Sequence, residues 1–504
     1  CVNCITSVPV NKGTVIKNSW KTIPFRPKKC HSQFSNSINL TMASKPTLAQ
    51  SLADSIRRQI QEGAYRSGQK LPSLRELSDL HGYSKNTVVA AFELLVADGV
   101  LEPRRGSGFY VSNNNKMPHH DEESNSLGRA MNIVWMMREQ FKTIPDAHPL
   151  GDGFPPTEWL SDLRLDKYHP KVVRSGMGTV FRYGNRFGYM PLREHLVHRL
   201  ESFGIGAKPS QILLTQGANS AMDLVIRYFV PPEATVLVDD PGYYLLFGKL
   251  KLANAKIIGV PRLADGPDLE ALEHLMAVHK PRLFFTQSSC HNPTGTDISP
   301  GKAFRVLKLA QEHNVMIVEN DALADFKPLS TPRLAALDQL ERTIYIGSFS
   351  KSFSASLRVG YIACSDDLAS ELADLKTLVA TNSSEYCERT VNVILREGHY
   401  ERHMVNLRER ATKATSAARE VLTQLGAEVL GNSPQALYLW ASLPGHTDTH
   451  ELAQKLQQQN ILLAPGRLFC VNSEEPCAWS RFNTGALADP KVAKALVNAL
   501  KKIS

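Results

Sequence analysis

The stretch Gly347-Ser-Phe-Ser-Lys-Ser-Phe-Ser-Ala-Ser-Leu-Arg-Val-Gly-Tyr361 places a lysine, Lys351, shortly after an apolar β-type run, Thr343–Ile346. A lysine just beyond a strand end has a fixed backbone that aims its amine, so it can attack an aldehyde and hold it covalently. Three side chains of types that bind phosphate through charge-assisted hydrogen bonds lie in the same stretch: Ser348, Ser350 and Arg358. The stretch therefore predicts a lysine that holds a phosphate-bearing aldehyde.

A strand-to-helix turn at Thr215-Gln-Gly-Ala-Asn-Ser-Ala-Met-Asp223 offers a second phosphate-binding element. The first amides of a helix lack partners within the helix and lie at the positive end of its dipole, so they bind anions. We expect these amides to be those of Ala218, Asn219 and Ser220. Three further segments carry polar and aromatic groups suited to a cofactor site: Tyr183-Gly-Asn-Arg-Phe-Gly-Tyr-Met-Pro-Leu-Arg193, Asp239-Asp-Pro-Gly-Tyr243 and His291-Asn-Pro-Thr-Gly295.

In their order along the chain, these segments resemble the fold-type I aminotransferases of class I and II, whose cofactor is pyridoxal 5′-phosphate (PLP). The resemblance implies that Lys351 binds PLP covalently, that Tyr243 stacks on the pyridine ring, and that Asn292 hydrogen-bonds the phenolic oxygen. It also implies a homodimer in which Tyr183 reaches the phosphate of the partner subunit's cofactor. Near the C-terminus, Arg481 lies in a segment that resembles the strand whose arginine clamps a substrate α-carboxylate with a bidentate fork; a structural role is the alternative.

The chain departs from the aminotransferase pattern at Val318-Glu-Asn-Asp-Ala-Leu-Ala-Asp-Phe326. The family places a carboxylate beside the pyridine nitrogen, which keeps that nitrogen protonated and lets the ring act as an electron sink. By strict register Asn320 replaces this carboxylate, and Ala322 or Leu323 stands where a tyrosine would help to hold the phenolic oxygen. Asp321 supplies the charge only if the strand end shifts by one residue, which reverses the face on which a side chain lies. Both Asn320 and Asp321 are candidate cofactor-binding residues, and an asparagine there favours a sensor over an efficient enzyme.

The segments around this site belong to a large α/β domain, which we expect over residues 131–504. Short apolar runs alternate there with helical stretches, which predicts a mostly parallel sheet. The clearest of these runs are Gln211–Thr215, Thr235–Val238, Leu283–Thr286, Val315–Val318 and Thr343–Ile346. Residues 113–130 are polar and lack apolar periodicity, and therefore predict a linker.

Residues 43–112 are expected to form a separate domain of three short helices and a hairpin. The first helix has the apolar stripe Leu48, Leu52, Ile56 and Ile60. Ser73-Leu-Arg-Glu76 has the capping-box pattern of a second helix, which runs to His81-Gly82. Ser84 caps a third helix with the predicted inner face Val88, Val89, Phe92, Leu95 and Val96. The last two helices form a helix-turn-helix, and two β-prone runs around Gly106-Ser-Gly form a wing.

This front domain closely resembles the GntR family of bacterial repressors. The resemblance rests on Gly68–Leu77, on Tyr83–Val88 and on the Arg-Arg-Gly-Ser-Gly wing, and it spans about residues 46–111. Short polar and cationic side chains at the start of a recognition helix reach bases and phosphates. The residues expected to bind double-stranded DNA are Arg75, Ser84, Lys85, Asn86, Thr87, Arg104, Arg105 and Gly106.

The formal net charge of +9 over 504 residues is weak evidence for a nucleic-acid partner. Residues 1–45 hold seven of these charges, with no Asp or Glu, and show no helical or strand period. We expect residues 1–42 to be a leader outside the native fold; an organellar transit peptide is the alternative. No apolar run approaches the ~20 residues that cross a bilayer, so a membrane role has no support. The scattered cysteines suit reduced thiols in the cytosol and predict no metal site.

A GntR-type domain joined to a fold-type I aminotransferase domain is identified as the MocR subfamily. The resemblance implies a cytoplasmic, homodimeric, PLP-dependent transcriptional regulator that senses an amine or amino-acid effector through an external aldimine. One alternative is a working aminotransferase, of the 2-aminoadipate or the aromatic or aliphatic amino-acid type, whose front domain is incidental or autoregulatory. Another is a DNA-binding protein with an inactive PLP fold. Enzymatic turnover is expected to be weak or absent.

Overall fold

A computed structural model describes residues 48–61, 65, 68–97, 100–104, 107–112, 147–174 and 181–503. The predicted leader, the predicted linker and the wing residues Arg105 and Gly106 lie outside these ranges. The chain divides into two compact units, Cys1–His119 and His120–Ser504, and each is described by itself.

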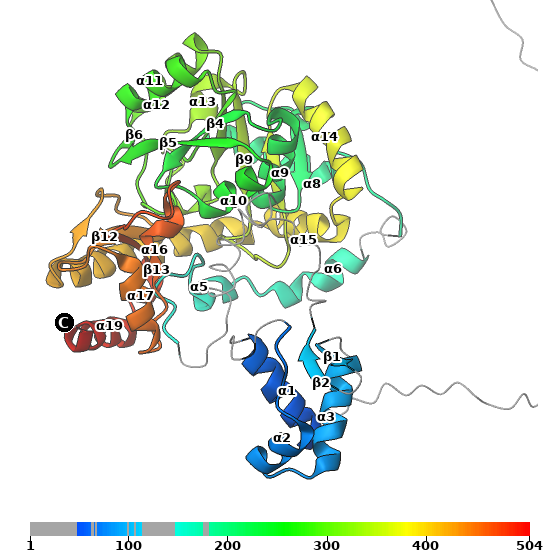
Figure 1. The fold of residues 1–504 in the computed structure, drawn as a ribbon. Helices are drawn as coiled ribbons and strands as arrows, with labels where there is room; N and C mark the ends of the chain where they lie inside the picture. Colours follow the sequence, from blue (N-terminus) through cyan, green and yellow to red (C-terminus); the bar gives the residue numbers. More distant parts are fainter. Residues whose placement is uncertain are drawn as a thin grey trace, which may run out of the picture. The chain divides into compact units, whose positions relative to one another are not determined.

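The described residues of the front unit form three helices and a two-stranded hairpin (Figure 1). Its elements are α1 (Leu48–Gln61), α2 (Leu74–His81), α3 (Lys85–Ala97), β1 (Leu101–Arg104) and β2 (Gly108–Val111). The predicted capping box is present, since the Ser73 amide donates to Glu76 Oε2 at 2.7 Å and the Glu76 amide donates to Ser73 Oγ at 3.2 Å. Gly82 then ends α2 at φ 68°, a left-handed conformation that glycine adopts without steric cost.

The core of the front unit joins all three helices to the hairpin. Its buried members include Leu52, Ile56, Leu77, Val88, Phe92, Leu95 and Leu101. The prediction that Val89 belongs to this inner face is wrong, because its side chain is 36% exposed. Val88, Phe92 and Leu95 follow the i, i+4, i+7 spacing of one helix face, and Val89 lies one position off that stripe.

The large unit is built on an eight-stranded sheet of order β3-β10-β9-β8-β7-β4-β5-β6. The strands are β3 (Ile212–Thr215), β4 (Thr235–Asp240), β5 (Lys256–Leu263), β6 (Gly266–Pro267), β7 (Leu283–Thr286), β8 (Met316–Asn320), β9 (Thr343–Ser348) and β10 (Gly360–Ala363). The five strands from β9 to β5 run parallel, and β10 is antiparallel to both of its neighbours. The predicted α/β class with a mostly parallel sheet is confirmed.

Helices cover both faces of this sheet, as the alternation of buried side chains along its strands demonstrates. Val236 and Val238 of β4 pack with α9 (Ala218–Phe229), α10 (Tyr244–Leu252) and α14 (Asp366–Ala380). Leu237 of the same strand packs with α11 (Leu269–His279) and α12 (Pro300–Glu312) on the other side. Successive strand residues point to opposite faces, so each strand of a sheet that is buried on both faces has a continuous run of apolar residues.

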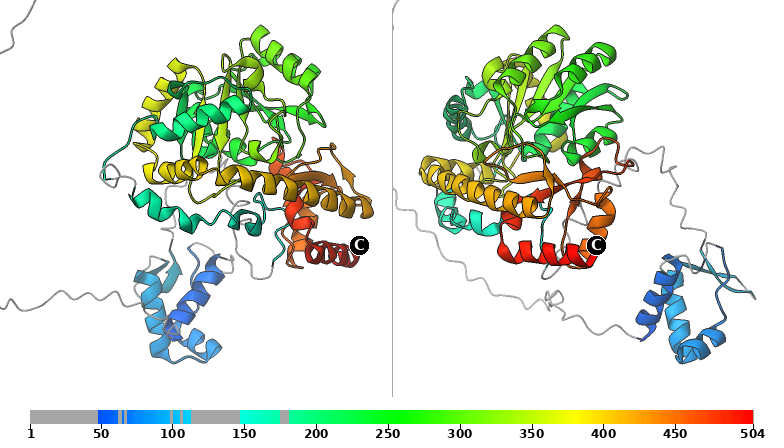
Figure 2. Two further views of the ribbon diagram at one scale, coloured as in Figure 1. Left: turned by 180° about the vertical axis from the view of Figure 1, so that it is seen from behind. Right: turned by 90° about the vertical axis from the view of Figure 1, so that its left-hand side faces the viewer.

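A second, antiparallel sheet follows in the C-terminal part of the chain, with the order β11-β12-β14-β13. Its strands are β11 (Glu428–Val429), β12 (Tyr438–Ser442), β13 (Ala464–Pro465) and β14 (Trp479–Asn483). The long helix α16 (His399–Gln424) joins the two cores, because Leu407 packs with the main-sheet cluster and Leu422 with the small-sheet cluster (Figure 2). Sequence reasoning had assigned β14 as a strand but had not separated this sheet.

The remaining described elements connect these layers. They are α5 (Thr157–Ser161), η2 (Leu165–Lys167), α6 (His169–Arg174), α8 (Met190–Ser202), η3 (Pro209–Gln211), η4 (Ala324–Phe326), α13 (Leu334–Asp338), α15 (Glu385–Arg396), α17 (Thr449–Gln457), η5 (Gly466–Phe469), α18 (Thr484–Leu487) and α19 (Pro490–Ile503). None of the helices in the described ranges is both long and apolar enough to cross a membrane.

Candidate cofactor-binding site

A cavity of about 260 Å³ lies where the parallel strands end. Ligands of open α/β sheets bind outside the carboxyl ends of the strands, so this is the expected place for a site. Ten of the residues predicted for the cofactor or substrate line it: Ala218, Asn219, Tyr243, Asn292, Asn320, Ser348, Ser350, Lys351, Arg358 and Arg481. These residues come from positions as far apart as 218 and 481, and the fold brings them to one cavity.

Lys351 lies just beyond the end of β9, and its Nζ is 3.2 Å from the centroid of the Phe154 ring. Burial and the nearby positive charge of Arg481 together lower the pKa of Lys351 to about 7, and Asp152 opposes the shift. A lysine with this pKa carries a large fraction of neutral, nucleophilic amine near neutral pH. The site therefore activates Lys351 for attack on an aldehyde.

The groups predicted to bind phosphate line the cavity together with the start of α9. Ser348 Oγ accepts a hydrogen bond from the Ser350 amide at 3.2 Å, so the two hydroxyls stand side by side. Arg358 holds a left-handed backbone, φ 52°, and its Nη2 donates to the Gln216 carbonyl at 2.9 Å. Gly217 has φ 79°, and a Cβ there would lie 2.9 Å from Arg358 Nη2. A glycine is therefore needed to let the guanidinium approach this turn.

Three of the residues predicted for the cofactor do not line the cavity; two of them are Ser220 and Tyr183, and the third is Asp321. Ser220 is absent from the described lining, and its amide donates to the Gly217 carbonyl at 3.1 Å. The expectation of three free amides is therefore corrected to two, those of Ala218 and Asn219. Tyr183 is 84% exposed and is also missing from the described residues that line the cavity.

Tyr243, Asn292 and Arg481 also line the cavity. The Tyr243 hydroxyl donates to Asn219 Oδ1 at 3.3 Å, and burial raises the pKa of Tyr243 above its ordinary value. Arg481 Nη1 donates to Asn292 Oδ1 at 2.9 Å, and its Nη2 donates to the Gly151 carbonyl at 2.7 Å. The Arg481 guanidinium carbon also lies 4.7 Å from the Tyr438 ring centroid. The arginine is fixed in place with its charged group at the cavity.

At the end of β8, Asn320 lines the cavity. Its Oδ1 is buried and has no hydrogen-bond partner among the described residues, while its Nδ2 approaches only the Met222 sulfur, at 3.9 Å. A buried amide oxygen is expected to be hydrogen-bonded, so an unpartnered one beside a cavity indicates a missing donor there. Ala322 and Leu323, where the family pattern has a tyrosine, also line the cavity and offer no side-chain hydrogen bond.

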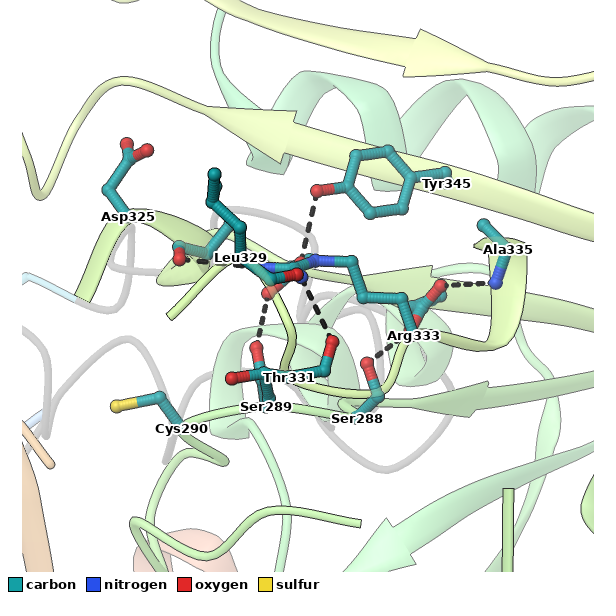
Figure 3. Close-up of polar contacts among 12 residues, drawn as sticks. Ser288, Ser289, Cys290, Asp325, Leu329, Thr331, Arg333, Ala335 and Tyr345 are labelled. Carbon is teal, nitrogen blue, oxygen red and sulfur yellow. Dashed lines mark hydrogen bonds and ion pairs between the residues drawn. The ribbon is translucent and has the colours of Figure 1, made fainter. Parts of the chain in front are cut away.

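Asp321 lies on the other face of β8 and does not reach the cavity. Its carboxylate accepts hydrogen bonds from Arg333 Nε at 2.7 Å, Ser289 Oγ at 2.6 Å and the Tyr345 hydroxyl at 3.0 Å, in the cluster around Arg333 that Figure 3 shows. Adjacent residues of a strand point to opposite faces, so Asn320 and Asp321 cannot both face the cofactor. The prediction of Asp321 as a cofactor-binding residue is wrong, because Arg333 holds its charge behind the sheet.

Sequence reasoning missed the segment that encloses Lys351 from the N-terminal side. Asp152, Gly153 and Phe154 all line the cavity. A Cβ on Gly153 would lie 3.5 Å from Arg481 Nη2 and 3.8 Å from Lys351 Nζ, and the Gly153 carbonyl accepts from the Tyr438 hydroxyl at 2.7 Å. The Gly-rich and Pro-rich stretch 151–156 signals a turn, but only the fold places it beside a lysine 200 positions away.

In the front unit, those predicted DNA-binding residues that the structure describes lie at the surface. Arg75, Lys85 and Asn86 are exposed at the starts of α2 and α3, and Ser84 Oγ accepts from the Thr87 amide at 3.2 Å. The exposed guanidinium of Arg104, in the hairpin, lies 4.2 Å from the Tyr110 ring centroid. Their placement leaves these side chains available to a partner.

Two families match the chain: Aminotransferase class I and II over residues 149–500, and Bacterial regulatory proteins, gntR family, over residues 48–111. The Uncharacterized HTH-type transcriptional regulator YdcR of Escherichia coli (strain K12) is 27% identical over 444 residues, which cover 86% of this chain and 93% of that relative. The Probable rhizopine catabolism regulatory protein MocR of Rhizobium meliloti is 29% identical over 381 residues, which cover 71% of this chain and 73% of MocR.

Among solved structures, the fold is similar to that of LysN, an α-aminoadipate aminotransferase from Thermus thermophilus, in complex with N-(5′-phosphopyridoxyl)-L-leucine. The TM-score is 0.67 at 23% sequence identity, and the match covers 74% of this chain and 98% of LysN. A likeness at 23% sequence identity is evidence for a shared fold only.

Fold and cavity define a PLP-binding protein, and the chain belongs to the aminotransferase class I and II family. Its gntR-family domain places it more narrowly among the MocR-type transcriptional regulators. The residues present fit PLP: Lys351 is activated, Gly217 and Arg358 form a cradle, and Asn320 has an unpartnered oxygen. The described part of the chain contains no group of three or more His, Cys, Asp or Glu placed to hold a metal ion.

Proposed function

We propose that this protein is a DNA-binding regulator that detects a primary amine or amino acid in its PLP pocket and changes its hold on an operator in response. PLP supplies an aldehyde that condenses with primary amines. Lys351 would hold this aldehyde when PLP is bound, and an incoming amine would compete with Lys351 for it. The neutral amine of Lys351 near pH 7 supports this exchange, because the same group must both attack and leave.

The observation that carries this proposal is the neutral Asn320 at the cavity. A carboxylate in that place would keep the pyridine nitrogen protonated and favour loss of the substrate α-proton. An amide holds no charge, so it stabilises the protonated ring less. Exchange of amines at Lys351 needs no such help, whereas transamination does, and Asn320 therefore favours detection over turnover.

Arg481 would select the effector. Its guanidinium faces the cavity and is oriented by Asn292 and the Gly151 carbonyl, as a carboxylate-binding arginine must be. An amino acid would place its amine at the cofactor and its carboxylate at Arg481. The exposed Tyr183 supports a homodimer in which this ring reaches the partner's site. A regulator that binds operator DNA acts in the cytoplasm.

The test is a gel shift on operator DNA with full-length protein, with and without PLP, across a panel of amines. Each primary amine is matched with its N,N-dimethyl analogue, which has the same charge but cannot condense with an aldehyde. We expect the primary amines alone to change DNA binding and the PLP absorbance. Lys351→Ala should respond to none of them. DNA binding that is the same under all conditions would refute the proposed coupling.

The second candidate function is an aminotransferase with a DNA-binding domain. The observation in its favour is that ten of its expected cofactor and substrate residues line one cavity. Incubation of the PLP-loaded protein with amino acids and a keto acid decides between the two. Sustained turnover at enzyme-like rates supports the aminotransferase, and a spectral change without turnover supports the sensor.

A further inference from the structure

Two cysteines lie close together in the C-terminal part of the chain. Cys470 directly follows η5, Cys477 lies two residues before β14, and their sulfur atoms are 3.9 Å apart. Both side chains are partly exposed. The other thiols in the described ranges are Cys290 and Cys364, which are buried, and Cys387 on α15. The pair is therefore placed to react both with a small reagent and with each other.

Backbone groups hold the two thiols side by side. Cys470 Sγ lies 3.5 Å from the Gly466 carbonyl oxygen, and Cys477 Sγ lies 3.9 Å from the Trp479 carbonyl oxygen. A Cβ on Gly466 would collide with Cys477 Sγ, so this sulfur packs directly on the Gly466 backbone. A disulfide has its sulfur atoms about 2.05 Å apart, so closure requires a movement of roughly 2 Å, within reach of side-chain rotation.

We propose that Cys470 and Cys477 form a dithiol that hydroperoxides oxidise reversibly to a disulfide. The Cys477 sulfur attacks the O–O bond of the hydroperoxide, which breaks; Cys477 becomes a sulfenic acid and the other oxygen leaves as an alcohol, or as water from hydrogen peroxide. The Cys470 sulfur then attacks Cys477, the S–S bond forms, and the sulfenic oxygen leaves as water with the remaining proton. The two sulfurs lose two electrons and the O–O bond accepts them.

The hydrogen bond between the two thiols determines which of them attacks the hydroperoxide. The hydrogen bond from the Cys470 thiol lowers the pKa of Cys477 below its ordinary value, and the same contact raises the pKa of Cys470. The thiolate is the nucleophile, so Cys477 reacts first and Cys470 resolves. Small thiols reverse the modification by exchange, because the disulfide would be partly exposed.

Neighbouring residues connect the dithiol to side chains that line the cofactor cavity. Phe469, the neighbour of Cys470, lies 4.8 Å from the Arg481 guanidinium carbon, and its carbonyl accepts from the Gly242 amide at 2.7 Å. Gly242 precedes Tyr243, and Cys477 leads into the strand that carries Arg481. Closing the disulfide draws these segments together, so we expect oxidation to weaken the binding of carboxylate-bearing effectors severalfold. This consequence rests on the proposed function, whereas the oxidation itself does not.

The chemistry is tested on full-length protein without PLP, treated with hydrogen peroxide and analysed by intact mass and peptide mapping. Wild type should lose two hydrogen atoms and two titratable thiols, with Cys470 and Cys477 in one cross-linked peptide, and dithiothreitol should restore both. Cys470→Ser should stop at a sulfenic acid on Cys477, which dimedone traps. Cys477→Ser should leave Cys470 reduced. Serine replaces only the sulfur atom, which limits disturbance of the fold.

The control is Cys387→Ser, which removes a half-buried thiol elsewhere and should behave as wild type. A cross-link through Cys387, cross-linking only between chains, or equal oxidation of wild type and both single variants would overturn the dithiol. A separate titration follows binding of amino acids to PLP-loaded protein before and after oxidation. If the disulfide forms but affinity is unchanged, the link to the cavity is wrong and the modification stands. If no amino acid binds at all, the proposed function fails and the dithiol is unaffected.

Discussion

The two faces of β8 differ in charge at its C-terminal end: the side chain that faces the cavity is neutral, and those that face away from it are carboxylates. Asn320 faces the cofactor cavity with a neutral amide and an oxygen that has no partner in the described structure. Glu319 and Asp321, its neighbours in the chain, face away from it, and Asp321 pairs with the buried Arg333. Glu319 accepts from the backbone amides of Leu334 and Ala335 at 2.9 and 2.8 Å, and burial raises its pKa to about 7. The carboxylates of this strand therefore serve the structure and not the pocket.

The comparison shows that a carboxylate next to Asn320 in the sequence does not supply its charge to the cavity. Moving Asp321 into the pocket would leave the buried Arg333 without its carboxylate, which costs several kcal/mol. A one-residue shift of β8 is thus opposed by the cluster behind the sheet. The two faces should respond independently to substitution: changes on the pocket face should alter chemistry, and changes on the rear face should alter stability.

The largest expected effect is the loss of covalent cofactor binding in Lys351→Ala. The variant has no amine at the strand end, so reduction with borohydride should leave no PLP bound to the chain. The matched control is Lys376→Met, which removes another buried lysine, one whose pKa burial lowers to about 8 and whose Nζ donates to the Leu214 carbonyl at 3.0 Å. Mass spectrometry after reduction should find PLP on the control and none on Lys351→Ala. Equal labelling of the two variants would contradict the assignment.

On the rear face, Arg333→Met should destabilise the large unit by about 3–5 kcal/mol, because Asp321 is left buried without its cation. Urea unfolding followed by far-ultraviolet circular dichroism measures the loss. Arg305→Met removes an exposed arginine that pairs with Glu273 at 3.3 Å, and should change stability by less than about 0.5 kcal/mol. The double variant Arg333→Met, Asp321→Asn should recover part of the stability. A single variant as stable as the Arg305 control would show that the cluster does not hold β8 in register.

The substitution Asn320→Asp tests the face of β8 that lies at the cavity. A carboxylate there would stabilise the protonated pyridine nitrogen, so transamination of an amino acid should rise about tenfold, a change of about 1.4 kcal/mol in the barrier. Single-turnover absorbance measurements on PLP-loaded protein mixed with the amino acid follow this rate. Asp321→Asn is the matched control on the other face and should lose stability without a gain in rate. An increase with Asp321→Asn and none with Asn320→Asp would reverse the assignment of the two faces.

Much of this arrangement could be predicted from the sequence, and the limits have physical causes. The apolar runs and the Lys351 stretch predicted the parallel sheet and the strand end that carries the lysine, because strand period and loop chemistry are local. The alternation of side chains along a strand also placed Asn320, by strict register, at the position that faces the cofactor. The ion pair between Asp321 and Arg333 could not be predicted, because the two residues come together only when the chain folds back after β8. The same holds for Phe154, which reaches Lys351 from nearly 200 residues away.

The smallest expected effect concerns the charge around Lys351. Its pKa is about 7, so the neutral amine fraction, and with it the rate of PLP attachment to the apoprotein, should rise with pH and level off above about pH 7. Asp152 favours the ammonium form; Asp152→Asn should therefore lower the pKa of Lys351 and move the midpoint of the rate profile to lower pH. Stopped-flow absorbance across pH measures this shift, with free PLP and a simple lysine derivative correcting for titration of the cofactor. Asp166→Asn, which changes an exposed carboxylate paired with Arg164, should leave the midpoint in place. A midpoint that stays in place in Asp152→Asn would mean that Asp152 does not act on the amine, and that burial and the nearby arginines set the pKa of Lys351.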